Sequence, residues 1–528
     1  MPPDLAIVVL AAGKGTRLKS ERAKVLHQAG GLLLVAHVLR AVGPLVRRGA
    51  RGPAGKSVVG VWVVLGHQAD AVRRVVEPWG ARTILQRPQL GTGHAVAQAV
   101  AALPRRIRRL LVLPGDAPLI RPESLQALLK AHSDSGSAVT LLTARLENPS
   151  AYGRILRGPD GAVEAILEQA ALRPEHAGLD EVNAGIYCFE RAKLVPVLKR
   201  LRRDNVHREY YLTDGIALLR RAGENIATYT TAEPEEILGV NTPAELARVD
   251  ALLRRRKAEA LMACGVTLYQ PETQAIDLDV SIGPDTIVER GVELRGGTRI
   301  GRRCYIGAFS ILQNASLADE VTVKPHCLVL NSRLGARVTV GPFAHLRDGA
   351  DIRKGARIGN YVEVKKSVVG EGSKAQHLAY LGDATIGRGT NIGAGTITCN
   401  YDGVKKNPTT IGDRVFVGSG TEFVAPVKVG RGAYVAAGST VTENVPSDAL
   451  AIARGRQVTK PGWARTRRQK LAAAKARKEE PVVAVRALSA AKSGRAAGLV
   501  SSLSGAKSRG GVKRRRRPQR HRKARRRK

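Results

Sequence analysis

A glycine-rich loop followed by two cations is the first part of the chain whose residues could do chemistry. The apolar run Ile7 to Leu10 predicts a buried parallel strand, and Gly13 and Gly15 come directly after it. Arg17 and Lys24 follow on the C-terminal side. The Walker spacing is missing, so the glycines alone are a weak signal. Because unshielded amides and positive side chains bind the same phosphate oxygens, the whole stretch predicts a phosphate site at the strand's end.

Polar residues after two further strands could bind a nucleobase and a metal ion. Gln86 has a carboxamide that could read the donor and acceptor edge of a pyrimidine. Gly91 and Thr92 lie in a small-residue turn that could form the floor under a flat base. Asp116 comes just after the run Leu110 to Leu113, where a carboxylate could hold Mg²⁺ on a phosphate. On the residues alone, a helix cap and an Asp turn are open alternatives.

The elements that would position these residues alternate between strands and helices. Apolar runs predict strands at Val58 to Leu65 and Leu110 to Leu113, and helices are expected through Leu32 to Val42, after Gln68 and after Pro122. Strand, helix, strand predicts a mainly parallel, Rossmann-like sheet covered on both faces. In such sheets ligands bind beyond the carboxyl ends of the strands, which is where the candidate residues fall.

A helix is expected to carry the chain out of this sheet. Thr242 is a capping residue, Pro243 suits the first helical position, and Glu245 can complete a capping box. The cations Arg254 to Lys257 are predicted to form a solvated face.

Apolar residues then recur every six positions, in three registers between residues 270 and 455. One register runs Ile282, Val288, Leu294, Ile300, Ile306, Leu312. A six-residue period fits neither a helix nor a single strand, but it fits a coil of three short strands per turn. The segment Glu371 to Asp383 departs from the period and is predicted to leave the coil as a loop, with a second long loop at Asn391 to Lys405. His377 lies in the first of them; a lone histidine is more often structural, but its neutral form can accept a proton from an amine.

Charge and cysteine content limit the remaining possibilities. The net charge is +41, and residues 461–528 hold 24 Lys and Arg against 2 Glu. This segment is predicted to be disordered, and its cations could bind RNA, DNA or anionic lipid without reading sequence; a solvated extension with no specific partner is equally open. The five cysteines have no CxxC spacing, so reduced, mostly buried thiols are expected rather than a disulfide framework or a zinc site. No transmembrane segment and no signal peptide are predicted, and a cytoplasmic protein is expected.

The first part of the chain resembles the sugar-nucleotide pyrophosphorylases, through LAAGxGTR at Leu10 to Arg17 and the lysine that follows. The resemblance implies UTP as substrate and Mg²⁺ as cofactor. It implies that Glu209 to Asp214 closes the sugar pocket. Ala23 departs from the proline that many relatives have before the lysine, so we expect a looser loop and a raised KM for UTP; Pro114 departs from a common aromatic. The implied nucleotide residues are Leu10, Ala11, Ala12, Gly13, Arg17, Lys24, Gln86, Gly91 and Thr92; the sugar-phosphate residues are Gly153, Glu168, Asn183 and Asn241; the metal ligands are Asp116 and Asn241.

The six-residue repeat resembles the hexapeptide-repeat, left-handed parallel β-helix of trimeric CoA-dependent acyltransferases. With HLxYxGD and GAGTITCNYDG in this order after a pyrophosphorylase domain, the chain resembles a family of bifunctional bacterial enzymes. The resemblance implies a homotrimer with His377 as the base and acetyl-CoA as a substrate. Asp348 and Ala379 depart from common residues at positions without a direct chemical role there. The implied sugar-phosphate residues are Arg347, Lys365, Tyr380 and Asn391, and those at the amine, the acetyl group and acetyl-CoA are Ala394, Asn400, Tyr401, Ser419, Ala437 and Arg454.

The predicted fold class is therefore α/β, a Rossmann-like nucleotidyltransferase domain followed by a left-handed parallel β-helix. The predicted domains are 1–241, a linking helix 242–264, the β-helix 265–460 and a basic tail 461–528. The predicted function is acetyl-CoA-dependent N-acetylation of glucosamine-1-phosphate, then uridylyl transfer from UTP to the product. The alternatives are a pyrophosphorylase for another sugar phosphate with an idle β-helix, and a non-catalytic regulatory assembly of the same folds.

Overall fold

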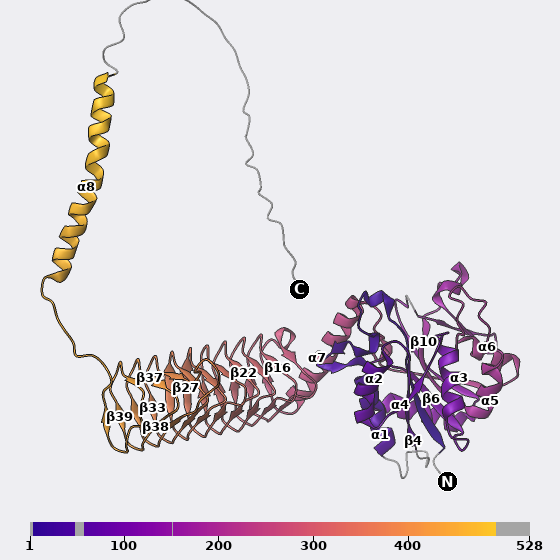
Figure 1. The fold of residues 1–528 in the computed structure, drawn as a ribbon. Coiled ribbons are helices and arrows are strands. Elements are labelled where there is room, and N and C mark those ends of the chain that lie inside the picture. Colours follow the sequence, from indigo (N-terminus) through magenta and orange to yellow (C-terminus); the bar gives the residue numbers. More distant parts are fainter. Residues whose placement is uncertain (1–3, 48–57, 150–151, 493–528) are drawn as a thin grey trace, which may run out of the picture. The chain divides into compact units, whose positions relative to one another are not determined.

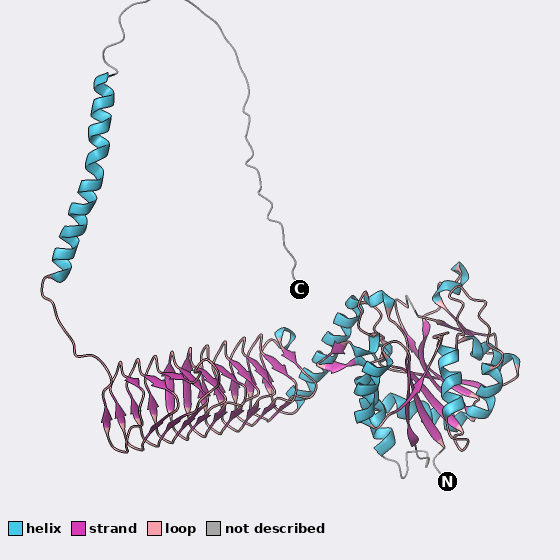
Figure 2. Cartoon of the chain, in the orientation of Figure 1, coloured by secondary structure: helices cyan, strands magenta, loops and turns pink. Residues whose placement is uncertain are grey.

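A computed structural model describes residues 4–47, 58–149 and 152–492 of the chain. The chain divides into two compact units, Met1–Arg454 and Gly455–Lys528. The first unit contains a sheet covered by helices and a long coil of short strands, which Figures 1 and 2 show as two differently built parts.

The sheet has nine strands, with the order β11-β7-β10-β6-β1-β4-β5 and with β8 and β9 attached beside β10. The central strand β1 pairs in parallel with β4 and β6, whereas β10 is antiparallel to both of its neighbours β6 and β7. The predicted mainly parallel sheet is thus confirmed, and its antiparallel pairs are those of β10 with β6, β7 and β8 and of β8 with β9. The strands are β1 (Leu5–Ala11), β4 (Val58–Leu65), β5 (Arg82–Leu85), β6 (Arg109–Pro114), β7 (Val139–Arg145), β8 (Arg154–Arg157), β9 (Val163–Leu167), β10 (Glu181–Glu190) and β11 (Ile226–Thr230), and a separate hairpin joins β2 (Gln28–Ala29) and β3 (Leu32–Leu33).

Helices cover both faces of this sheet because β1 is apolar on both sides. Ile7 and Val9 pack into one buried cluster, and Ala6 and Val8 pack into another. Such continuous apolar strands are typical of sheets buried on both faces. The helices are α1 (Leu34–Arg47), α2 (Ala69–Val76), α3 (Thr92–Ala102), α4 (Pro122–Ser135), α5 (Arg191–Leu198), α6 (Asp214–Arg221) and α7 (Pro243–Ala263).

Helix α7 begins with the predicted capping box. Thr242 accepts a hydrogen bond from the backbone of Glu245, and the Glu245 side chain accepts one from the backbone of Thr242. The prediction of a solvated face at Arg254 to Lys257 is largely wrong, because α7 lies between the sheet and the first turns of the coil. Arg254 forms ion pairs with Asp250 and Asp277.

The partners of these cations lie on both sides of α7. Arg256 donates to the backbone oxygen of Leu119 (2.9 Å), and Lys257 donates to that of Val280 (2.6 Å). Arg255 alone remains mostly exposed, although it still pairs with Glu235. These cations donate hydrogen bonds to buried carbonyl oxygens and so stabilise the packing around α7. The periodicity of the sequence does not reveal such contacts.

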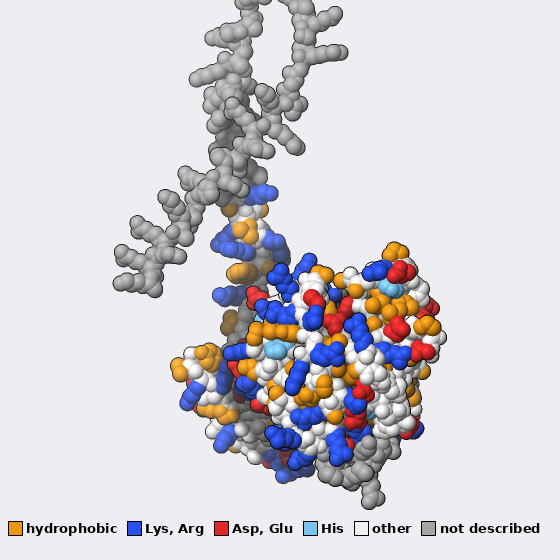
Figure 3. All heavy atoms as spheres, turned by 90° about the vertical axis from the view of Figure 1, so that its right-hand side faces the viewer, with side chains coloured by type: hydrophobic (Ala, Val, Ile, Leu, Met, Phe, Trp, Pro, Cys, Tyr) orange, Lys and Arg blue, Asp and Glu red, His pale blue; other side chains and the backbone are white. Residues whose placement is uncertain are grey.

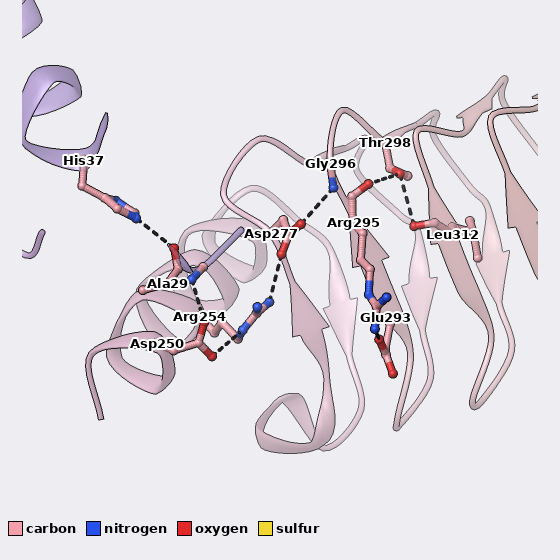
Figure 4. A network of polar contacts seen from close by, with 11 residues as sticks. Ala29, His37, Asp250, Arg254, Asp277, Glu293, Arg295, Gly296, Thr298 and Leu312 are labelled. Atoms are coloured by element: carbon pink, nitrogen blue, oxygen red, sulfur yellow. Dashed lines mark hydrogen bonds and ion pairs between the residues drawn. The ribbon is translucent and has the colours of Figure 1, made fainter. Parts of the chain in front are cut away.

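The hairpin of β2 and β3 joins the sheet to the coil through the network in Figure 4. The Gly30 amide donates to Asp250 Oδ1 (2.6 Å), and Arg254 links Asp250 to Asp277. Asp277 in turn accepts a hydrogen bond from the amide of Gly296 (2.9 Å). At Gly31, with φ at +81°, an added Cβ would overlap the Asp277 carboxylate, so this junction requires a glycine.

The coil stacks three sheets of parallel strands, with inward residues such as Val288, Leu312 and Val364 fully buried. The first sheet contains β12 (Thr267–Leu268), β15 (Ile287–Val288), β18 (Tyr305–Ile306), β21 (Thr322–Val323), β24 (Thr339–Val340), β27 (Arg357–Asn360), β30 (Lys374–His377), β33 (Asn391–Ile392), β36 (Phe416–Val417), β39 (Tyr434–Val435) and β41 (Leu450–Ala451). The second contains β13 (Ala275–Ile276), β16 (Glu293–Arg295), β19 (Ile311–Gln313), β22 (Leu328–Leu330), β25 (His345–Arg347), β28 (Glu363–Lys365), β31 (Tyr380–Gly382), β34 (Ile397–Cys399), β37 (Glu422–Val424) and β40 (Thr440–Val441). The third contains β14 (Ser281–Ile282), β17 (Arg299–Ile300), β20 (Ser316–Leu317), β23 (Arg333–Leu334), β26 (Asp351–Ile352), β29 (Val368–Val369), β32 (Ala384–Ile386), β35 (Thr409–Ile411) and β38 (Val427–Val429).

The prediction that Glu371 to Asp383 leaves the coil is wrong. Strand β30 pairs with β27 and β33, and β31 pairs with β28, so the coil continues through this segment. The six-residue step is kept, but one inward position is Ala375, whose small side chain hides the apolar register. The departure from the coil is residues 400–408, between β34 and β35. Only the end of the second predicted loop is therefore a loop.

The prediction of a disordered tail is also wrong for its first part. Helix α8 runs over Trp463–Lys492, because this stretch is rich in Ala, Lys, Arg and Gln, which have high helix propensity. Residues 493–528 lie outside the described part of the chain. No helix among the described residues is long and apolar enough to cross a membrane.

Candidate functional site

A cavity of about 730 Å³ opens at the carboxyl ends of β1 and β6. Most of the predicted nucleotide and sugar residues line it, whereas Arg17, Gly153 and Asn241 are not among the lining residues. The lining residues are Leu10, Ala11, Ala12, Gly13, Lys14, Gly15, Thr16, Lys24, Val25, Gln86, Gln89, Gly91, Thr92, Ala95, Pro114, Asp116, Glu168, Asn183, Gly185, Tyr187, Glu209, Leu212 and Thr213.

The two predicted cations converge on the predicted metal ligands. Lys24 forms an ion pair with Asp116, and its Nζ also donates to Asn241 Oδ1 (2.6 Å). Arg17 Nη2 donates to the same oxygen of Asn241 (2.9 Å). Gly15 allows this approach, because it has a positive φ of 69° and an added Cβ would lie 2.6 Å from the Lys24 Cβ.

Asp116 and Asn241 are held together by the backbone and by the cap of α7. The Val240 amide donates to the backbone oxygen of Asp116 (3.2 Å). The Asn241 amide donates to Glu245 Oε2 (2.6 Å), so the capping box also fixes the predicted metal ligand. The residue before the helix is therefore positioned by the helix itself.

These two side chains fit a hard divalent cation. One carboxylate and one amide oxygen both lie within reach of the Lys24 ammonium, so they offer negative potential at one point. The described residues contain no group of three or more His, Cys, Asp or Glu side chains that could hold a metal on their own. A two-ligand site suits Mg²⁺, which keeps water and phosphate oxygens in its coordination shell.

The nucleobase end of the cavity is built by two segments in close contact. The Gln86 side chain is buried and its Nε2 donates to the Gly91 oxygen (3.0 Å) and lies 3.1 Å from His94 Nδ1. Thr92 Oγ1 accepts a hydrogen bond from the Leu212 amide (3.1 Å). At Gly91 an added Cβ would lie 2.7 Å from the backbone oxygen of Tyr210. The segment Glu209 to Asp214 is thus packed on the turn, as predicted for a segment that closes the pocket.

The sugar end is organised by an irregular stretch of β10. Asn183 Nδ2 donates to the Tyr187 hydroxyl (2.7 Å), and Asn183 Oδ1 accepts from the Gly185 amide (3.1 Å). The Gly153 oxygen accepts from the Asn183 amide (2.8 Å), so Gly153 supports Asn183 from behind. Burial raises the pKa of Tyr187, which keeps its hydroxyl protonated. Sequence reasoning missed Tyr187; an aromatic two residues after a strand glycine was its signal.

Glu168 is the predicted carboxylate for the sugar hydroxyls. It lines the cavity and accepts a hydrogen bond from the Thr213 hydroxyl (2.8 Å). This contact connects the segment that packs on the turn with the sugar end of the cavity. Its role toward a sugar stays a prediction.

In the coil, His377 ends β30 at one corner. Its Nδ1 lies 2.9 Å from Asn360 Oδ1, on the neighbouring strand β27. Since an amide oxygen only accepts hydrogen bonds, this contact assigns the proton to Nδ1 and leaves the Nε2 lone pair available. Sequence reasoning missed Asn360; it lies seventeen positions before His377, about one turn of the coil earlier.

Most of the predicted acetyl-CoA residues follow His377 along the same corner. Hydrogen bonds join successive turns: Gly420 donates to the oxygen of Ala394 (2.7 Å), and Gly438 donates to that of Ser419 (2.8 Å). Arg454 Nη1 then donates to the oxygen of Ala437 (2.8 Å). The structure therefore brings Ala394, Ser419, Ala437 and Arg454 into one column.

The predicted sugar-phosphate residues of the coil lie on two sheets. Arg347 and Lys365 are paired neighbours on β25 and β28. Asn391 pairs with Lys374, at the opposite end of β30 from His377, which is about 10 Å along a strand. One chain by itself does not bring Asn391 beside the predicted base.

The loop of residues 400–408 carries Asn400 and Tyr401. Asn400 Nδ2 donates to Asp383 Oδ2 (2.5 Å) and lies 3.4 Å from the Tyr380 hydroxyl. Tyr401 is exposed, and its hydroxyl donates to the oxygen of Gly403 (2.6 Å). Tyr380 and Asn400 therefore lie close together.

Comparison with known proteins identifies the family. Residues 7–213 match the MobA-like NTP transferase domain, and residues 408–443 match the bacterial transferase hexapeptide (six repeats). The chain is 48% identical over 466 residues to the bifunctional protein GlmU of Koribacter versatilis, covering 88% of this chain and 97% of that protein. It is 46% identical to the GlmU proteins of Pelobacter propionicus and Geobacter metallireducens, with 87% of this chain and 98% of each relative covered. The chain belongs to the GlmU family.

Membership of the GlmU family confirms several predictions. The hexapeptide match and the three stacked parallel sheets confirm the left-handed β-helix, and the nucleotidyltransferase match confirms the first domain. The prediction of a bifunctional enzyme rather than a regulatory assembly is confirmed as well. The individual site residues remain predictions, supported by the geometry described above.

Proposed function

We propose that this GlmU-family chain acetylates the amine of glucosamine-1-phosphate with acetyl-CoA. It then transfers uridylyl from UTP to N-acetylglucosamine-1-phosphate, giving UDP-N-acetylglucosamine and pyrophosphate. The observation that carries the second reaction is the convergence of Asp116, Asn241, Lys24 and Arg17 at the glycine-rich loop. The observation that carries the first is His377, oriented by Asn360 on the corner that leads to the acetyl-CoA column.

For uridylyl transfer, the chain's own residues bind and neutralise phosphates. Mg²⁺ held by Asp116 and Asn241 would supply Lewis-acid stabilisation of the charge that develops on the transferred phosphate. Lys24 and Arg17 exchange their contacts with these ligands for contacts with the triphosphate. A phosphate oxygen of the sugar phosphate then attacks the α-phosphorus of UTP, and pyrophosphate leaves. Glu168 and Asn183 orient the sugar for this in-line attack.

For acetyl transfer, His377 acts as a general base. Its Nε2 takes a proton from the sugar amine while the nitrogen attacks the thioester carbonyl, and the C–S bond then breaks to release CoA. Asn360 Oδ1 accepts a hydrogen bond from the Nδ1–H group and so keeps the ring in the tautomer whose Nε2 lone pair is free. Arg347, Lys365 and Tyr380 hold the sugar phosphate, and the column from Ala394 to Arg454 holds acetyl-CoA.

The proposed homotrimer is supported by the positions of the predicted acetyl-transfer residues. Asn391 lies too far along the sheet to meet His377 of the same chain, so we propose that a second copy completes the site. A stack of Phe309, His326, Phe343 and Tyr361 on one corner supports this, because its aromatic members are about half exposed. Exposed apolar ridges of this kind are common in subunit interfaces.

Two further proposals concern the environment of the enzyme. Cytoplasmic location is supported by the free thiols of Cys264, Cys304, Cys327 and Cys399. Nonspecific polyanion binding is supported by the described part of α8, where Lys and Arg side chains gather (Figure 3). On the face of the first unit that Figure 3 shows, both charge signs are mixed.

The test of the two reactions uses one variant for each site. Purified protein is incubated with glucosamine-1-phosphate, acetyl-CoA, UTP and Mg²⁺, and the products are identified by mass spectrometry. Asp116→Ala should abolish uridylyl transfer and spare acetyl transfer, and His377→Ala should do the reverse. Loss of both reactions in either folded variant would contradict separate sites, and wild-type acetylation by His377→Ala would remove it as the base.

A further inference from the structure

The loop after β4 packs directly on the phosphate-binding loop. The His67 amide donates to the backbone oxygen of Ala12 (3.0 Å). Gly66 makes this approach possible, because an added Cβ would lie 2.5 Å from the same oxygen. Two loops that follow neighbouring strands of the sheet are therefore in backbone contact beside the cavity.

Gln68 connects this loop to the residues just before Lys24. Its Oε1 accepts a hydrogen bond from the Ala23 amide (2.8 Å), and its Nε2 donates to the backbone oxygen of Glu21 (2.8 Å). One carboxamide thus satisfies a donor and an acceptor two residues apart. Ala23 is 1% exposed, so its amide would lose a partner that water could not easily replace.

The backbone of Gln68 shows that this contact has a cost. Gln68 lies in the left-handed region, with φ at 51° and ψ at 41°, which non-glycine residues seldom adopt. It precedes α2, but its side chain makes no capping hydrogen bond to that helix. The side chain is instead turned to the phosphate-binding loop, so the contacts with Glu21 and Ala23 offset an unfavourable backbone conformation.

The same contact revises the expectation for Ala23. Its φ of −54° suits a proline, but a proline could not donate the hydrogen bond that Gln68 accepts. The chain therefore restrains this point of the loop with a hydrogen bond from another loop rather than with a ring. The expected loosening of the loop by Ala23 is offset by Gln68.

We propose that Gln68 is a positioning residue for Lys24 in uridylyl transfer. Gln68 is not among the residues that line the cavity, so it acts through the loop and not on the substrate. Without its carboxamide, the loop holds Lys24 in the phosphate-binding position for a smaller fraction of the time. Apparent affinity for UTP falls by that fraction, while the rate of the bound complex changes less. This inference rests on the proposed uridylyl transfer.

The first test measures kinetics and UTP binding by Gln68→Ala and Gln68→Glu in the full chain. Gln68→Ala should raise the KM and the Kd for UTP roughly three- to tenfold, as expected for loss of one or two hydrogen bonds, with kcat within about twofold of wild type. Gln68→Glu should bind UTP at least as weakly as Gln68→Ala does, because a carboxylate cannot donate a hydrogen bond to the Glu21 oxygen. Gln28→Ala, at an exposed glutamine on β2, is the matched control and should match wild type.

The second test is a rescue. In the Gln68→Ala background, Ala23→Pro fixes φ near its present value and removes the amide that lost its acceptor. The double variant should return the KM for UTP to within about twofold of wild type, with acetyl transfer unchanged throughout. The proposal is overturned if Gln68→Ala keeps the wild-type KM, if it lowers both activities and the Tm together, or if Ala23→Pro restores nothing. Absence of uridylyl transfer in the wild type would instead refute the proposed function.

Discussion

At the scale of single residues, acidic neighbours hold the guanidinium of Arg347, a predicted sugar-phosphate residue. Its guanidinium donates to Glu363 Oε1 (2.8 Å) and to Asp348 Oδ2 (2.8 Å). The hydrogen bond to Glu363, with that of Asp348, raises the pKa of Arg347, so the group stays cationic but is partly neutralised. Asp348 departs from a residue common in relatives at a position without a direct chemical role there, and in this chain it contacts the predicted sugar-phosphate residue Arg347.

Removing the Asp348 charge should therefore strengthen sugar-phosphate binding. Asp348→Asn keeps a residue that tolerates the left-handed backbone, where φ is 54°. The KM for glucosamine-1-phosphate should fall about two- to fivefold, the effect of releasing one exposed ion pair. Asp351→Asn, which releases Arg353 instead, is the control and should leave the KM unchanged. A KM that rises in Asp348→Asn would show that Asp348 orients Arg347 rather than competing with phosphate.

At the scale of elements, the start of α7 links helix capping to metal binding. Glu245 accepts hydrogen bonds from the amides of Asn241 and Thr242 (2.6 and 2.8 Å). The Glu245 carboxylate thus caps the start of α7 and also fixes the predicted metal ligand Asn241. A change in the cap should appear as a change in metal dependence.

Glu245→Ala should raise the Mg²⁺ concentration that gives half-maximal uridylyl transfer, by roughly three- to tenfold, as for loss of a helix cap. Glu245→Gln keeps an oxygen acceptor and should show less than half of that effect. Acetyl transfer, measured on the same preparations, is the internal control. An unchanged Mg²⁺ dependence in Glu245→Ala would show that Asn241 is held by other contacts.

The loop of residues 400–408 is a second element whose stabilising contacts can be tested. Asp402 accepts hydrogen bonds from the amides of Val404 and Lys405 and from the side chain of Asn407. The amide of Lys405, then Asn407 and Val404, lower the pKa of Asp402 to about 2. Because this pKa is lowered on folding, its contribution is present above the ordinary value of 3.8 and is lost as pH falls through about 2.

Loop order should therefore be independent of pH in the neutral range but sensitive to Asp402 itself. Asp402→Ala should lower kcat/KM for acetyl transfer roughly five- to tenfold, because Asn400 and Tyr401 lose their fixed position. Asp402→Asn keeps one oxygen acceptor and should be intermediate. Uridylyl transfer should match wild type in both. A pH profile of acetyl transfer that changes shape above pH 5 in Asp402→Asn would contradict this account.

At the scale of the whole molecule, the chain combines a compact catalytic unit and a cationic segment. The six Lys and Arg side chains of α8 up to Arg477 are all exposed. Acidic residues are few in residues 461–528, where 24 Lys and Arg face 2 Glu. Attraction of this segment to a polyanion depends on counterion release and not on shape. The predicted domain boundaries at residues 241, 264 and 460 remain predictions.

A chain that ends at Pro461 should lose polyanion binding and keep both activities. The full chain should bind a mixed-sequence DNA duplex with an affinity that falls steeply with salt, and equally well when the sequence is scrambled. The shortened chain should bind at least tenfold more weakly at low salt. Equal binding by both chains would assign the interaction to the first unit, and equal binding of phosphatidylserine vesicles by the full chain would show attraction to any anionic surface.

The sequence by itself determined the elements and the two kinds of chemistry. Local periodicity predicted the buried strands and the six-residue coil, because the backbone geometry of each element fixes the spacing at which its side chains face the core. The capping box of α7 was readable because its partners are three residues apart. The prediction of the coil failed where a small residue, Ala375, stands at an inward position and weakens the apolar pattern. The prediction of a disordered tail failed for α8 because the high content of charged residues was given more weight than their helix propensity.

Only the tertiary structure decided which distant groups meet. Asn241 and Arg17 are separated by 224 positions, and Gln68 and Ala23 by 45, so no local spacing connects them. Their contacts depend on how loops pack at the end of the sheet, which sums many long-range interactions. The same holds for Asn360 with His377, which are 17 positions apart. The glycine-rich loop is thus recognisable from its residues, but the groups that hold its lysine in place come from elsewhere in the fold.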